Sequence, residues 1–270
     1  MNVFKHAVMA SALVALGACA TSGGSTAASA DAGVFAGKST LDAAIDAAGG
    51  QAALAQVKEL EWTGKATVNA GGKTTNLNVI TVIRPQTNWA RSTSWTDAAG
   101  QKKARTLQAE MGKAWDVNVV NWTPLPEAQA AHENQQFGLY KLMLLAPLKD
   151  PGATVSEGKV GADGVRTIKA QLEGGVPAEL GFDATGKLVS ASMSVRDAKG
   201  GADVAQTVTF SGEVVSNGVK WPKQISIQQN GAPYFDLELT TFEANATVKP
   251  RPLQHTLDDG QTPPGEQDAG

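Results

Sequence analysis

The sequence predicts a mainly β (α+β) domain whose large antiparallel sheet, of about eleven strands, curls into a half-open barrel with helices covering its concave face. Three observations support this prediction. Segments with alternating apolar and polar residues follow one another, turn dipeptides separate them, and only two intervals have helical periodicity instead. Consecutive strands with short connections pair antiparallel, and the twist between neighbours should curl a sheet of this size.

The first helical interval opens the folded region. Ser39 or Thr40 can cap a helix, and apolar residues recur at helical spacing from Leu41 to about Leu60. Gly49-Gly50 lies within this interval, and glycine disfavours a helix interior. We therefore expect two short helices before the sheet begins.

From Leu60 the period changes to that of a strand with one dry face. Its inward members are Leu60, Trp62, Gly64, Ala66 and Val68. The same alternation predicts further strands over residues 74–84, 87–95, 102–110 and 113–120. These segments form the first part of the antiparallel sheet.

The second helical interval opens at Thr123-Pro124-Leu125-Pro126 and stops at Pro147. Its end, Leu142-Met143-Leu144-Leu145, is apolar nearly all round, so it should be buried against the dry face of the sheet. The remaining strands are expected over residues 155–159, 165–172, 178–183, 188–195, 204–214, 219–228 and 234–242. Asn217-Gly218 and Asn230-Gly231 are dipeptides typical of two-residue hairpins.

Both ends of the chain read as segments outside the domain. Residues 1–18 have the pattern of a secretory signal peptide, with an apolar run too short to span a membrane. Residues 19–38, mostly Ala, Ser, Gly and Thr, predict a flexible tether, and the proline-containing residues 250–270 predict a disordered tail. Residues 39–249 remain as one domain.

The signal ends at Leu16-Gly17-Ala18-Cys19, which resembles a bacterial lipobox. The resemblance implies that Cys19 becomes the acylated N-terminus, and acyl chains such as palmitate would then attach the protein to a membrane. Ala20 is not the Asp that the resemblance associates with inner-membrane retention, which favours the outer membrane, facing the periplasm. The alternative is an ordinary signal-peptidase site and a cysteine packed in the core. Because Cys19 is the only cysteine, no internal disulfide can form.

The composition argues against several classes of function. The formal net charge is −3 and no basic stripe occurs, so nucleic acid is not an expected partner. The sequence holds three scattered histidines and lacks phosphate-loop, dinucleotide and zinc-protease motifs. We therefore expect no metal, no cofactor and no enzymatic activity. A hydrolase with a carboxylate pair in a cleft stays open as an alternative.

The six tryptophans are the most suggestive side chains. Aromatic rings can wall an apolar cavity, or they can pack in the core of a barrel. If the half-barrel holds a cavity, the candidate lining residues are Trp62, Leu77, Val79, Trp115, Phe137 and Met143.

Two parts of the sequence resemble the LolA/LolB-like superfamily of bacterial lipoprotein carriers and receptors. Residues 43–64 resemble its opening helix and first strand, and residues 212–225 with 242–245 resemble its closing hairpins. The resemblance implies an unclosed barrel whose concave face, covered by helices, accepts acyl chains or another apolar ligand. With the lipobox, it predicts a lipid-anchored, non-catalytic protein that binds a lipid or a lipoprotein acyl chain. The alternative is an envelope sensor or scaffold that binds a protein partner.

Overall fold

The computed structural model describes residues 33–96 and 104–246. The predicted signal peptide, Cys19 with most of the tether, and the predicted tail lie outside the described residues, so these parts of the interpretation stay predictions. The first described helix begins at Thr40 and the last strand ends at Ala244.

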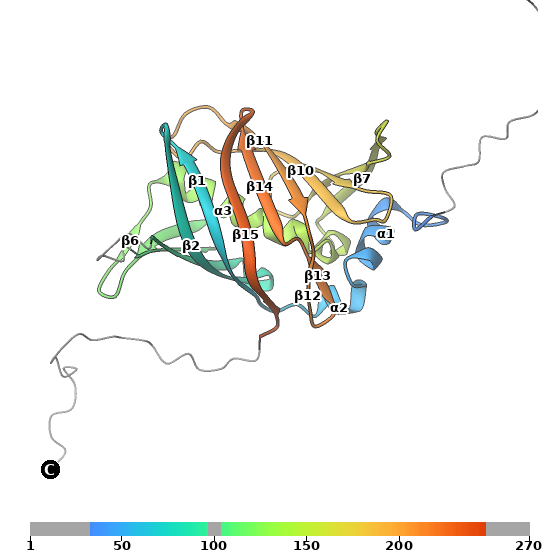
Figure 1. Ribbon diagram of the computed structural model, residues 1–270, viewed down its shortest axis with the longest axis horizontal. Coiled ribbons are helices and arrows are strands. Elements are labelled where there is room, and N and C mark those ends of the chain that lie inside the picture. The colour runs from blue at the N-terminus through green and yellow to red at the C-terminus, as the bar shows by residue number, and fades with distance from the viewer. Residues whose placement is uncertain (1–32, 97–103, 247–270) are drawn as a thin grey trace, which may run out of the picture.

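The fold is dominated by one large antiparallel sheet, which confirms the predicted class. Within the described residues it has thirteen strands, in the order β6-β5-β4-β3-β2-β1-β15-β14-β11-β10-β9-β8-β7. The sheet curves around helix α3 and does not close, since β6 and β7 lie at opposite ends of it (Figure 1). Its strands are β1 (Leu60–Ala70), β2 (Lys73–Arg84), β3 (Trp89–Trp95), β4 (Ala104–Glu110), β5 (Lys113–Val117), β6 (Trp122–Pro124), β7 (Thr154–Val160), β8 (Arg166–Gln171), β9 (Ala178–Phe182), β10 (Leu188–Val195), β11 (Val204–Ser211), β14 (Gln224–Gln229) and β15 (Ala232–Ala244).

The large sheet has more strands than the expected eleven or so partly because Trp122–Pro124 pairs with β5 as β6, where the sequence predicted the opening of a helical interval at Thr123-Pro124. A second difference adds a small separate sheet. The two expected strands over 204–214 and 219–228 are each interrupted, at Gly212 (φ 64°) and at Pro222, which lacks an N–H for pairing. Between the breaks, β12 (Val214–Ser216) and β13 (Val219–Trp221) form a separate two-stranded hairpin. Both predicted two-residue turns are present, with positive φ at Asn217-Gly218 and at Asn230-Gly231.

Three α-helices accompany the sheet in the described residues, and two of them are the pair expected at the start. These are α1 (Thr40–Ala47) and α2 (Gln51–Ala55), separated by Gly49 and Gly50 at φ 126° and 90°. The Ser39 hydroxyl accepts a hydrogen bond from the Asp42 N–H at 3.1 Å, so Ser39 is the cap. Two short 3-10 helices, η1 (Pro85–Thr87) and η2 (Ala146–Lys149), complete the set.

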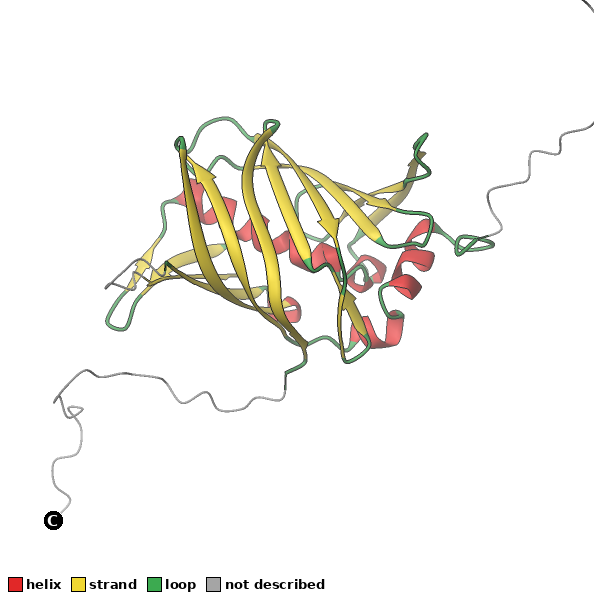
Figure 2. Ribbon diagram, in the orientation of Figure 1, coloured by secondary structure: helices red, strands yellow, loops and turns green. Residues whose placement is uncertain are grey.

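The long helix α3 (Glu127–Met143) lies inside the curve of the sheet (Figure 2). Its last turn and the residues after it are deeply buried: Leu139, Leu142, Met143, Leu144 and Leu145 are each 4 % exposed or less. This confirms that the apolar end of the helical interval packs on the sheet. The concave face of the half-barrel is therefore filled mainly by α3.

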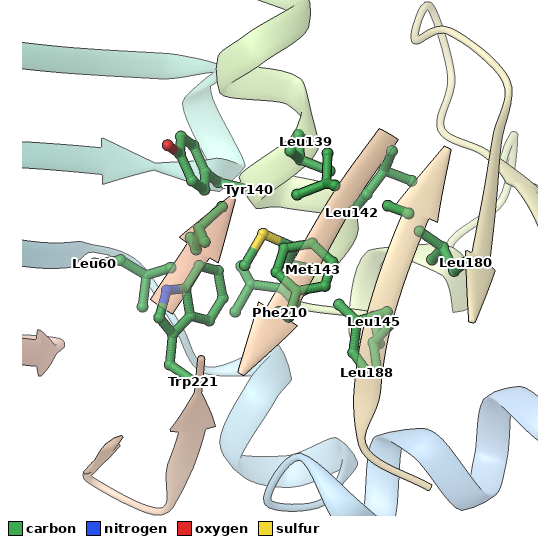
Figure 3. Close-up of a cluster of buried hydrophobic side chains, with 14 of the residues drawn as sticks. Leu60, Leu139, Tyr140, Leu142, Met143, Leu145, Leu180, Leu188, Phe210 and Trp221 are labelled. Atoms are coloured by element: carbon green, nitrogen blue, oxygen red, sulfur yellow. The ribbon is translucent and has the colours of Figure 1, made fainter. Parts of the chain in front are cut away.

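Aromatic rings form the centre of the core beside α3 (Figure 3). Trp62 of β1 lies edge-on to Tyr140 of α3, with ring centroids 4.9 Å apart, and 6.2 Å from Trp221 of β13. Trp221 in turn stacks on Phe242 of β15 at 5.7 Å. The small β12–β13 hairpin thus contributes an indole ring to the same core.

Candidate functional site

A pocket of about 310 Å³ lies where α3 meets turns from both wings of the sheet. We call it the α3 pocket. One side consists of the β2–β3 and β4–β5 turns, and the other consists of the β8–β9 turn, so both wings of the sheet contribute to it. Its apolar lining comprises Ile83, Pro85, Trp89, Ala90, Ala109, Met111, Phe137, Leu139, Leu142, Leu172 and Val176.

Small residues leave this space open. Gly138 lies in the middle of α3 and lines the pocket, and a Cβ built on it would meet no atom within 4 Å. On the facing strands, Ala90 and Ala109 are buried and present only methyl groups. A glycine in a helix interior costs about 0.5–1 kcal/mol relative to alanine. Gly138 therefore leaves the pocket open at a cost in helix stability.

Charged groups lie at the rim of the α3 pocket. The Arg84 guanidinium pairs with the Glu59 carboxylate at 2.8 Å and covers the Trp89 ring at 4.6 Å. The Lys141 ammonium donates a hydrogen bond to the Asn88 side-chain oxygen at 2.9 Å. Glu173, from the β8–β9 turn, supplies the carboxylate of the lining. The pocket thus combines an apolar interior with a charged edge.

The structure separates the six candidate lining residues predicted from the sequence. Phe137 is the one that lines the α3 pocket. Trp62, Val79 and Met143 belong to the main core cluster and are each 5 % exposed or less. Leu77 is half-buried against that cluster and borders a separate polar hollow between β1, β2, β14 and β15.

Trp115 lies on the other face of the sheet. Its neighbour Ala114 pairs with Ala109, and both pack toward Ala130 of α3. Successive side chains of a strand point to opposite faces, so Trp115 projects from the convex side, 6.1 Å from the ring of Trp122. It cannot line a cavity inside the half-barrel.

Sequence reasoning missed most of the pocket, because turns and small residues form it. An isolated glycine within a helical pattern was the available signal, since such a glycine commonly has a packing or functional reason. The turn residues 85–88 and 172–176 carried no comparable pattern. Their meeting across α3 depends on the curvature of the whole sheet.

A polar cluster lies further along α3, toward its N-terminus. The His132 Nδ1 is 2.7 Å from the Arg196 carbonyl oxygen, and Gln136 and Gln206 exchange hydrogen bonds at 2.7 and 3.1 Å. Burial raises the pKa of Glu133 above its ordinary range, although electrostatic interactions with His132 and Arg105 oppose that shift. Burial and the Glu133 charge raise the pKa of Tyr234 to about 12. The sequence analysis singled out none of these residues.

The described residues provide no group of three or more His, Cys, Asp or Glu side chains that could hold a metal ion. None of the helices in the described part of the chain is both long and apolar enough to cross a membrane.

Comparisons with known proteins show the fold. No family model matches the sequence, and no curated protein matches it. A Vibrio parahaemolyticus domain named for outer membrane lipoprotein sorting is similar in structure, with a TM-score of 0.51 and 9% identity, over 82% of this chain and 95% of that one. A DUF1329 family protein from Desulfovibrio piger also has a TM-score of 0.51, with 10% identity, over 78% and 95% of the two chains. These likenesses confirm the fold expected from the resemblance to the LolA/LolB-like superfamily.

Proposed function

We propose that this protein binds an apolar ligand, a lipid or a lipoprotein acyl chain, in the α3 pocket without catalysing a reaction. The observation that carries the proposal is an apolar pocket left open between α3 and both wings of the sheet, with Gly138 at the helix position that faces it. The name of the Vibrio parahaemolyticus domain, which refers to lipoprotein sorting, is consistent with such a ligand.

The physical basis of binding is the removal of apolar surface from water. Each buried methylene contributes about 0.8 kcal/mol, so a chain reaching only partly into the pocket gains several kcal/mol. A volume of about 310 Å³ is at the lower end of the range for small-molecule sites, roughly 300–1,000 Å³. The pocket therefore suits one chain, or the end of one, better than a bulky multi-chain lipid.

The experiment is native mass spectrometry with lipid extraction on the chain from Ala20 onward, exported to the periplasm of a bacterial host. Stoichiometric co-purified lipid, or saturable binding of the neutral fluorophore phenylnaphthylamine, is the expected result. A protein that emerges empty and binds no fluorophore contradicts the proposal.

We also propose that Cys19 is acylated and holds the domain at the outer membrane, facing the periplasm. The support is the sequence alone, in the signal peptide and Leu16-Gly17-Ala18-Cys19. Metabolic labelling with palmitate should mark the wild-type chain and leave the Cys19→Ser variant unlabelled. Labelling of both chains, or of neither, contradicts acylation at this position.

A second candidate function is docking of a protein partner, as in an envelope sensor or scaffold. One observation favours it: at the edge of the sheet, Val119 and Val120 in the turn between β5 and β6, and Trp122 at the start of β6, are exposed by 82%, 84% and 55%. Exposed apolar clusters of this kind mark interaction sites. A protein that purifies empty and crosslinks to an envelope protein through this turn would support docking over lipid binding.

A further inference from the structure

The α3 pocket has a cation at its mouth that no carboxylate neutralises in the described residues. Lys141 is half-buried in the last turn of α3 and lines the pocket. Its ammonium has three donors, and its hydrogen bond to the Asn88 side-chain oxygen, 2.9 Å long, accounts for one of them. The other two donors are available to a ligand at the mouth.

Asn88 holds Lys141 at that position. Asn88 has a left-handed backbone (φ 50°) at the end of η1, and its carbonyl oxygen accepts a hydrogen bond from the Met111 N–H at 3.3 Å. The β2–β3 and β4–β5 turns are thereby joined, and the Asn88 side chain is presented to α3. The ammonium group therefore lies on the border between the apolar interior and the rim.

The other charges at the rim leave Lys141 as the group suited to a new contact. The Arg84 guanidinium is already paired with Glu59 and stacked on Trp89. The Glu173 carboxylate also lines the pocket, on the side of the β8–β9 turn, where its side chain lies next to Gly152. A ligand in the pocket would place its apolar part against the inner walls and its head beside Lys141 at the mouth.

From this arrangement we propose that the ligand of the α3 pocket is a single-chain amphiphile with an anionic headgroup, a carboxylate or a phosphate, which Lys141 binds. The inference rests on the proposed function, since it names the headgroup of the ligand in the same pocket. Hydrogen bonds between ionised partners are about twice as strong as neutral ones, so the headgroup charge should matter for affinity.

The test compares three probes that share a dodecyl-length chain: dodecanoate, dodecyl phosphate and the neutral dodecanol. Each is titrated against phenylnaphthylamine on the chain from Ala20 onward, at a pH where both acids are ionised. The variants are Lys141→Met, which keeps the apolar stem, and Lys141→Arg, which keeps the charge. Lys159→Met, on the exposed strand β7 and outside the pocket lining, is the matched control.

The wild type should bind both anions at least about 5-fold more tightly than dodecanol. Lys141→Met should bring the anions to the dodecanol level and change dodecanol by less than about 2-fold, while Lys141→Arg and Lys159→Met keep the preference. If only one anion is preferred, the source of the headgroup is settled as carboxylate or phosphate. Equal binding of all three probes by the wild type, or a preference that survives Lys141→Met, overturns the inference but leaves the pocket as a binding site. If no probe binds, the proposed function fails with it. Circular dichroism of each variant shows that it is folded.

Discussion

Gly138 offers the most direct test of the α3 pocket, because a side chain placed there should block the ligand without harming the fold. The position is helical, and a Cβ would meet no atom within 4 Å. Gly138→Ala should stabilise the protein by about 0.5–1 kcal/mol through helix propensity. Gly138→Leu should gain a similar amount and also fill part of the pocket.

The effect on affinity follows from the volume that the leucine takes. Leucine adds about four carbon atoms, which displace about as many methylenes of a bound chain, each contributing roughly 0.8 kcal/mol. The expected loss is about 3 kcal/mol, or about 100-fold in Kd, against a small change for Gly138→Ala. Phenylnaphthylamine titration and thermal unfolding of the three chains supply both numbers. If Gly138→Leu binds within about 2-fold of Gly138→Ala, the ligand does not occupy this pocket, and if it unfolds below the wild type, the space beside Gly138 is not open.

Three further predictions concern stability. Burial raises the pKa of Glu133 above its ordinary value of 4.5, so the folded chain keeps this proton to higher pH than the unfolded chain does. The protonated Glu133 therefore contributes its full stability below about pH 4.5, and this contribution is lost as the pH rises through the pKa of the folded state. In urea unfolding, Glu133→Gln should therefore gain on the wild type as the pH rises above about 4.5, and a pH-independent difference would count against the shift. Ser39→Ala should lower the free energy of unfolding by about 1 kcal/mol, whereas Ser39→Thr, which keeps the hydroxyl that caps α1 and donates to Asp42, should lower it clearly less. Equal losses in the two variants would show that the cap contributes little. Trp221→Ala should lower the free energy of unfolding by about 3–5 kcal/mol. Trp221→Phe should lower it clearly less, since phenylalanine keeps a ring on Phe242 and removes a buried indole N–H that has no acceptor. Equal losses of stability in the two variants would contradict this.

The sequence predicted the periodic parts of the fold well because local rules decide them. Ser39, Gly49-Gly50 and the two Asn-Gly turns each act within a few residues, and the structure shows all of them as expected. The alternation of β1 also identified its buried face. Alternation does not say how the phase of one strand relates to that of another four strands away. Trp62 and Trp115 both looked inward, but the pairing of Ala109 with Ala114 places Trp115 outside.

The α3 pocket was beyond such rules for a different reason. Its walls come from turns far apart in the sequence, at residues 84–88, 111–112 and 172–176, and their approach depends on the accumulated curvature of a thirteen-stranded sheet. The sequence shows only that an isolated glycine, Gly138, lies within the helical pattern. What that glycine faces is a property of the whole sheet.

The two halves of α3 are held in different ways, and the pocket lies near the boundary between them. The C-terminal part, from Leu139 onward, is fixed by apolar side chains that are almost fully buried. The N-terminal part packs the small side chain of Ala130 against Ala109 and Ala114 and is otherwise held mainly by hydrogen bonds of His132 and Gln136. It also carries the partly buried carboxyl of Glu133, which costs desolvation energy. Contacts of the second kind are cheaper to break and remake, because water can replace them. A ligand that needs more room beside Gly138 would therefore displace the N-terminal part of α3 while the leucine-rich end stays anchored in the core.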